Sequence, residues 1–172
     1  SMTEYDEFET ELDREEIRIK NVPFFGMVND GIGYIRLSNF TEQAGSEVRD
    51  AFIALKTDND LKGIVLDLRG NPGGLLNEAV NVSNVFVAKN DIVVSTKGRI
   101  DEWDKDYMTL NDPVDEELPV VVLTNKGSAS ASEIVSGSIQ DLDRGLVVGQ
   151  KSFGKGLVQT TRSLTYNTKL KV

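Results

Sequence analysis

The sequence predicts an α/β domain whose mixed, largely parallel sheet is flanked by helices. Three runs of strand length, 63–68, 119–123 and 146–148, are mostly apolar, as is typical of strands buried in a parallel sheet. Turns rich in glycine or serine follow the first two runs, and apolar residues at helical spacing follow each turn. Strand, turn and helix in series indicate parallel strands joined by helices.

A β-hairpin is expected before these units. Phe24 to Val28 and Ile32 to Leu37 are apolar and β-rich, and Asn29-Asp30-Gly31 between them is a turn sequence. Further upstream, Ile17 and Ile19 alternate with charged residues, which predicts a short strand.

Three helices are expected, each with one apolar face that would cover the sheet. The first spans Glu47 to Lys56, the second follows Gly74, and the third follows the serine-rich turn after Gly127. Their apolar faces are formed by Val48, Ala51, Phe52 and Leu55, by Leu75, Ala79, Val82 and Phe86, and by Ile134, Val135, Ser138, Ile139 and Leu142.

The remaining segments are predicted from shorter patterns. Residues 92–95 read as a strand, and the polar stretch 98–117 reads as a surface excursion. Residues 149–156 form a glycine-punctuated loop, and Leu157 onward is strand-like because it is rich in β-branched residues.

Composition excludes several classes of protein. The 172 residues include no His and no Cys, so a Ser-His-Asp triad, a thiolate nucleophile and zinc sites built on His or Cys are excluded. The net charge is −9, but residues 1–16 carry eight acids and one base, so the rest of the chain is nearly neutral. With no basic cluster, no nucleic-acid partner is expected. No metal or organic cofactor is predicted either.

The serine-rich segment Gly127-Ser-Ala-Ser-Ala-Ser-Glu133 has two interpretations. Ser130-Ala-Ser-Glu133 fits a capping box, which would make it only the start of a helix. Alternatively, Ser130 is a nucleophile at a helix N-terminus, where free amides stabilise an oxyanion.

A second candidate segment runs from Gly149 to Gly156. It resembles a phosphate-binding loop, but Gly156 replaces the Mg²⁺-binding hydroxyl and a strand-like stretch replaces the helix. The remaining interpretations are an exposed turn lysine, or Lys155 held between two glycines beside Phe153 in a partly dry site. A serine nucleophile in a chain without His needs another base, and lysine is the known substitute.

The turn Gly73-Gly74 is the third candidate. It is either a tight strand-to-helix connection or the source of a backbone amide for an oxyanion hole.

Four motifs together resemble serine peptidase family S41, the carboxyl-terminal processing or tail-specific proteases. The matching segments are Gly33 to Arg36, Asp67 to Leu75, Gly127 to Ile134 and Phe153 to Gln159. The resemblance implies a ClpP/crotonase-like core and a Ser–Lys dyad that cleaves polypeptides near their C-termini. The implied roles are Ser130 as nucleophile, Lys155 as general base and Gln159 as the residue that orients the lysine. Asp141 matches an aspartate sometimes grouped with the dyad, and amides of Ala131 and of Gly73 or Gly74 form the implied oxyanion hole.

The resemblance also implies how the chain is organised. We expect residues 1–22 to be an acidic tail with the exit strand of a preceding PDZ domain, and residues 23–172 to be the catalytic core, truncated at its C-terminus. The expected substrates are polypeptides with nonpolar C-terminal tails, in the periplasm or cell envelope of a bacterium. Self-association through the truncated edges is expected, because unpaired strand edges recruit other chains.

Two other functions remain open. A crotonase-type acyl-CoA enzyme would also use glycine amides as an oxyanion hole, without needing Ser130 and Lys155. A non-catalytic peptide-binding module of the same family would keep the fold with a relict site.

Overall fold

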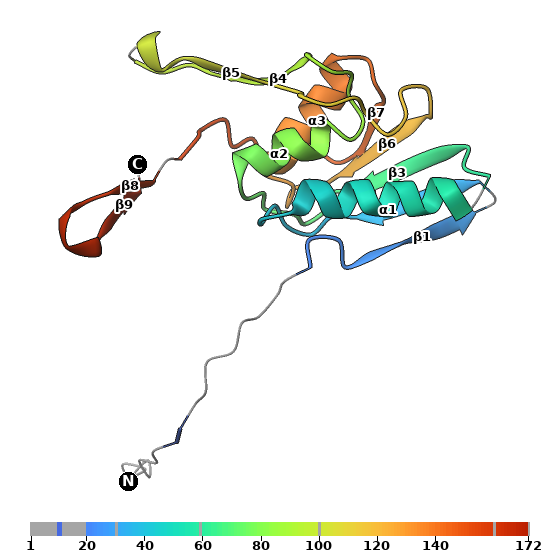
Figure 1. The fold of residues 1–172 in the computed structure, drawn as a ribbon, viewed down its shortest axis with the longest axis horizontal. Coiled ribbons are helices and arrows are strands. Elements are labelled where there is room, and N and C mark those ends of the chain that lie inside the picture. Colours follow the sequence, from blue (N-terminus) through green and yellow to red (C-terminus); the bar gives the residue numbers. More distant parts are fainter. Residues whose placement is uncertain are drawn as a thin grey trace.

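A five-stranded sheet with the strand order β1-β2-β3-β6-β7 forms the centre of the computed structural model (Figure 1). The structure describes residues 10–11, 20–29, 31–58, 60–99, 101–159 and 161–171. The strands are β1 (Phe24–Asn29), β2 (Ile32–Arg36), β3 (Gly63–Asp67), β6 (Val120–Thr124) and β7 (Leu146–Gly149). β1 is antiparallel to β2, and every other neighbouring pair in this sheet is parallel. The predicted α/β class, hairpin and largely parallel sheet are confirmed.

Three helices pack on one face of this sheet: α1 (Ala44–Asp58), α2 (Leu76–Ser83) and α3 (Ala131–Asp141). Ile35, Leu66 and Val122 lie side by side in register on β2, β3 and β6, and all three belong to the buried core. The adjacent row of Tyr34 and Val65 lies on the opposite face and is only partly buried. The alternation along each strand therefore directs one row of side chains toward the helices.

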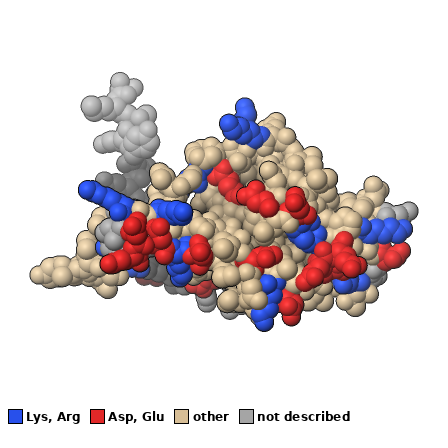
Figure 2. All heavy atoms as spheres, turned by 90° about the horizontal axis from the view of Figure 1, so that it is seen from above, with Lys and Arg blue, Asp and Glu red and all other residues tan. Residues whose placement is uncertain are grey.

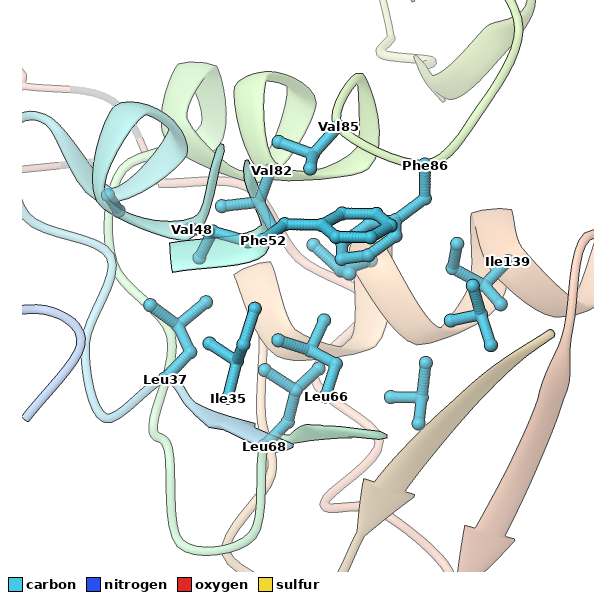
Figure 3. Packing of buried hydrophobic residues seen from close by; sticks show 14 of the residues in the cluster. Ile35, Leu37, Val48, Phe52, Leu66, Leu68, Val82, Val85, Phe86 and Ile139 are labelled. Atoms are coloured by element: carbon cyan, nitrogen blue, oxygen red, sulfur yellow. The ribbon is translucent and has the colours of Figure 1, made fainter. Parts of the chain in front are cut away.

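The core lies between the sheet and the three helices (Figure 3). Phe52 of α1 and Phe86, just beyond α2, are both fully buried, and their rings stack with centroids 5.6 Å apart. Three of the four predicted apolar residues of the second helix are buried, but Leu75 is 48% exposed and precedes the helix. Leu142 lies at the end of α3 and is also exposed.

Two small antiparallel ribbons extend from the main body (Figure 1). The first pairs β4 (Ile92–Thr96) with β5 (Lys105–Met108), so the surface excursion expected over 98–117 contains a strand that the sequence did not predict. The second pairs β8 (Thr161–Ser163) with β9 (Lys169–Lys171). The strand expected from Leu157 begins only at Thr161, because residues 157–159 make no strand pairing. Short 3₁₀ turns at Asp101–Trp103 and Thr165–Asn167 lie between the strands of each ribbon.

The surface carries both signs of charge. Figure 2 shows acidic and basic side chains interspersed over one face, without a large area of a single sign. Within the described ranges, no helix has the length and apolar character needed to cross a membrane. The short strand predicted around Ile17 and Ile19 lies outside the described residues.

Candidate active site

The glycine turn and the serine turn meet at one edge of the sheet. β3 and β6 are parallel neighbours, and the chain leaves β3 toward Gly73-Gly74 and leaves β6 toward Ser130. The carboxyl ends of parallel strands lie at the same edge, which is where sites gather in open α/β sheets. The Ala129 amide donates a hydrogen bond to the Asn71 carbonyl at 3.1 Å, so the two turns are in direct contact.

Ser130 immediately precedes α3 and has an unusual backbone conformation. Its φ of 55° and ψ of −114° lie in a region that residues other than glycine rarely adopt. Its amide donates to Glu133 Oε2 at 2.8 Å, and its carbonyl accepts from the Glu133 amide at 2.8 Å. The Glu133 side chain thus reaches back to the helix start, as the capping-box interpretation predicts. Backbone strain that the surroundings hold in place is a frequent feature of functional sites.

One cavity of about 360 Å³ brings together six of the seven predicted site residues. Ser130, Lys155 and Gln159 lie on its wall. The other lining residues are Gly73, Gly74 and Ala131, together with the apolar Pro72, Leu75, Leu76, Ile134, Leu157 and Val158. Asp141 lines a separate cavity, which runs along α3 from Glu133 to Asp141 and contains none of the other six residues. The structure therefore does not bring Asp141 to the other candidates.

Lys155 and Gln159 contact each other inside this cavity. The Lys155 ammonium donates to Gln159 Oε1 at 3.5 Å, a long hydrogen bond. Within the described part of the chain, no hydrogen bond joins the Lys155 ammonium to the Ser130 hydroxyl. Phe153 is 68% exposed, which does not fit the interpretation in which its ring helps to exclude water from Lys155. Its backbone amide donates to the Ser128 carbonyl.

The Glu133 carboxylate holds residues 152–156, here called the lysine loop, against the start of α3. Its Oε1 accepts from the Ser152 hydroxyl at 2.7 Å and from the Gly154 amide at 2.6 Å. Its Oε2 accepts from the Lys155 and Ser130 amides, both at 2.8 Å. Burial would raise the pKa of this carboxyl, but the four hydrogen bonds outweigh burial and hold the pKa below its ordinary value. Sequence reasoning assigned Glu133 a capping role and missed these contacts with the loop.

The amides of the predicted oxyanion hole are not equivalent. The Gly73 amide already donates to Asn71 Oδ1 at 2.9 Å. Among the described residues, the amides of Gly74 and Ala131 donate to no protein acceptor. Gly74 and Ala131 are therefore the two amides available to a developing negative charge.

A charged cluster lies at the end of β3. Asp67 is buried and accepts a 2.6 Å hydrogen bond from the Tyr34 hydroxyl and a bidentate pair from the Arg69 guanidinium, with Nε on Oδ1 and Nη2 on Oδ2. Burial opposes ionisation of Asp67, but the bonds from Arg69 and Tyr34 outweigh it and lower the pKa of this carboxyl. Burial and the adjacent carboxylate raise the pKa of Tyr34. None of these three residues lines the Ser130 cavity.

Within the described ranges, no three acidic side chains are grouped so that they could hold a metal ion. The polar groups that line the Ser130 cavity are a hydroxyl, an amine, a carboxamide and backbone amides.

Comparison with known proteins gives the family. Residues 31–172 match peptidase family S41. The chain is 44% identical over 163 residues to a carboxy-terminal-processing protease of Bartonella bacilliformis, and 40% identical over 169 residues to a "Probable CtpA-like serine protease" of Staphylococcus aureus. These alignments cover 92% and 96% of this chain. The chain belongs to peptidase family S41.

A solved structure agrees in fold. The photosystem II D1 C-terminal processing protease is 31% identical, with a TM-score of 0.76 over 92% of this chain and 43% of that one. The chain spans 37% and 33% of the lengths of the two curated relatives.

Proposed function

We propose that this chain is the catalytic core of a serine endopeptidase that acts on polypeptides through a Ser–Lys dyad. The observation that carries the proposal is the single cavity lined by Ser130, Lys155, Gln159 and the unpaired amides of Gly74 and Ala131. The chain has no His, so a lysine base suits a serine nucleophile here. No role is assigned to Asp141, because it lines a different cavity.

The proposed mechanism needs only these groups. Lys155, in its neutral form, takes the Ser130 hydroxyl proton as the oxygen attacks the peptide carbonyl carbon. The Gly74 and Ala131 amides donate to the resulting oxyanion, and Gln159 holds the lysine amine. The Lys155 ammonium then gives its proton to the leaving amine, which leaves an acyl group on Ser130. Lys155 then takes a proton from water as the water oxygen attacks the acyl carbon, and it gives that proton to the Ser130 oxygen as the acid leaves.

Polypeptide tails are the proposed substrates. Two of the similar proteins are named for C-terminal processing. Leu75, Leu76, Ile134, Leu157 and Val158 give the cavity an apolar wall, which supports a preference for nonpolar side chains near the scissile bond. The curated relatives named above are bacterial, and a bacterial cell envelope is the proposed location. Self-association through exposed strand edges stays a prediction.

The test combines covalent labelling with cleavage. A fluorophosphonate should modify Ser130, as located by peptide mass mapping, and the chain should cleave a peptide with a nonpolar C-terminus. Ser130→Ala should abolish both, and Lys155→Met should reduce both below detection. Ser136→Ala, which removes a buried hydroxyl from the same helix, is the matched control and should keep both.

Each alternative function gives a different result. Tight peptide binding with neither labelling nor cleavage favours a peptide-binding module. Acyl-CoA turnover that survives Ser130→Ala favours the crotonase-type enzyme. Cleavage that survives Lys155→Met contradicts the proposed dyad.

A further inference from the structure

The oxyanion hole of this site draws its two amides from different strand–helix units. Gly74 lies on the turn after β3, and Ala131 lies at the start of α3 after β6. Two amides bind one oxygen well only if their spacing is held to within a fraction of an ångström. Some group must therefore fix the glycine turn against the serine turn.

Asn71 lies between these turns and is fully buried. Its side chain acts on the glycine turn: Nδ2 donates to the Leu37 carbonyl at 2.9 Å, and Oδ1 accepts from the Gly73 amide at 2.9 Å. Its backbone acts on the serine turn: the carbonyl accepts from the Ala129 amide at 3.1 Å and from the Ser132 hydroxyl at 2.9 Å. One residue thus connects the end of β2, the glycine turn and the residues on both sides of Ser130.

The close approach of Gly73 to the serine turn leaves little freedom in this arrangement. Gly73 has a φ of 95°, and a Cβ placed there would lie 2.6 Å from the Ala129 carbonyl oxygen and 2.8 Å from the Ala131 nitrogen. The two backbones are therefore in contact, and Gly73 cannot shift toward the serine turn. The bond from the Gly73 amide to Asn71 Oδ1 orients the Pro72–Gly73 peptide plane. The next plane, which carries the Gly74 amide, is held by the Phe40 amide, which donates to the Gly73 carbonyl at 3.3 Å.

We propose that Asn71 is a positioning residue that selects the oxyanion donors. By engaging the Gly73 amide, Asn71 leaves the Gly74 amide as the donor from the glycine turn. Through its carbonyl, it keeps that amide in register with the Ala131 amide. This inference rests on the proposed peptidase function, because it assigns the donors for that reaction.

The direct test uses the unmodified chain and a peptide boronic acid. The Ser130 oxygen adds to boron, its proton passes to Lys155, and the resulting tetrahedral anion imitates the oxyanion intermediate. In ¹⁵N-labelled protein, we expect the amide protons of Gly74 and Ala131 to shift downfield on binding, while the Gly73 amide stays close to its free position. A downfield shift at Gly73 with none at Gly74 would overturn the proposal.

A variant tests the same inference kinetically. Asn71→Ala should lower kcat by roughly 10- to 100-fold, as expected for misplaced oxyanion donors, and leave KM within about twofold. The inhibition constant of the boronic acid should rise by the same factor as kcat falls. Ser83→Ala is the matched control, since it removes one buried 2.9 Å hydrogen bond to Ser138 far from the site.

The outcomes separate positioning from plain structural support. If Ser83→Ala and Asn71→Ala lose similar stability and similar kcat, or if Asn71→Ala keeps its kcat, the proposal is wrong. If Asn71→Ala does not fold, the amide shifts of the unmodified chain decide. A folded, unmodified chain that neither cleaves peptides nor binds the boronic acid contradicts the proposed function itself, whereas a cleaving chain with a shifted Gly73 amide contradicts only the role of Asn71.

Discussion

The backbone amides of Ser130 and Lys155 donate to the same oxygen, Oε2 of Glu133, each at 2.8 Å. The proposed nucleophile and base therefore share one anchoring atom, although they are twenty-five positions apart in the sequence. A carboxylate suits this position because both of its oxygens accept hydrogen bonds and neither donates. The Glu133 side chain thus fixes the distance between the backbones of Ser130 and Lys155, and it takes no part in the proposed proton transfers.

Replacement of this carboxylate by an amide should loosen the lysine loop. Glu133→Gln keeps the shape, but its NH₂ group faces two donors and cannot accept from them. We expect amide hydrogen exchange over residues 152–156 to accelerate by at least about tenfold, because the loop loses hydrogen bonds to a charged carboxylate, which are stronger than bonds between neutral groups. Peptide cleavage should fall by a similar factor. Glu47→Gln is the control, since Glu47 accepts from Asn21 and Val22 away from the cavity. If amide hydrogen exchange over residues 152–156 is equally fast in both variants, Glu133 does not hold the lysine loop in place.

The stabilisation of the lysine loop by Glu133 should also depend on pH in a defined direction. The pKa of Glu133 lies below its ordinary value of 4.5, so the folded state binds this proton more weakly than the unfolded state does. Its stabilisation is therefore complete above about pH 4.5 and is lost as the pH falls through the lowered pKa. Hydrogen exchange at 152–156, corrected for its intrinsic pH dependence, should be flat from pH 7 to 5 and rise in stronger acid. In Glu133→Gln this acid-dependent increase should be absent; its persistence would assign it to another group.

Tyr34→Phe tests the cluster at the end of β3. The lost phenol bond to Asp67 should lower the free energy of unfolding by about 1–2 kcal/mol at pH 7, as for a hydrogen bond to a charged partner. Because the pKa of Asp67 is lowered in the folded state, this cost should shrink as the carboxyl is protonated in strong acid. Denaturant unfolding at pH 7 and pH 2.5 measures both values. Tyr107→Phe, whose ring lies 4.6 Å from the Lys105 ammonium, is the control and should change little.

The stacked pair at the centre of the core should dominate stability. Phe52→Ala removes a fully buried ring from its stack with Phe86 and should cost about 3–5 kcal/mol in denaturant unfolding. Phe153→Ala removes the same side chain from a site that is 68% exposed and should cost less than about 1 kcal/mol. Similar losses in the two variants would contradict this description of the core.

Most of the central sheet was predictable because its signals are local. The hairpin of β1 and β2 has a turn sequence between two β-rich runs, and β3 and β6 are apolar along nearly their whole length. β5 was not predictable, because Lys105 to Met108 is mostly exposed and carries no apolar alternation. β5 is a strand because it pairs with β4, and nothing in its own four residues predicts that pairing.

The residue types at the site were predictable from the sequence, but the hydrogen bonds that hold these residues in place were not. A serine at a helix start, a lysine between glycines and a Gly-Gly turn can each be seen in the sequence. The contacts of Glu133 with Ser152, Gly154 and Lys155 span about twenty positions and have no local pattern. The engagement of the Gly73 amide by Asn71 lies within two residues, yet it requires the side-chain conformation that burial against Leu37 imposes.

Ser130 immediately precedes α3, and the first turn of α3 carries the Glu133 carboxylate that holds the Lys155 backbone. A small sliding of α3 over the sheet therefore displaces the proposed nucleophile and base together and leaves their separation nearly constant. The glycine turn is held on two sides: the Gly73 carbonyl and the Leu75 amide are hydrogen-bonded to Phe40, beyond the end of β2, and the Asn71 carbonyl is hydrogen-bonded to Ala129 and Ser132 at the start of α3. A displacement of α3 would therefore also pull on the glycine turn through Asn71, so the proposed oxyanion donors and the proposed proton-transfer pair are mechanically coupled.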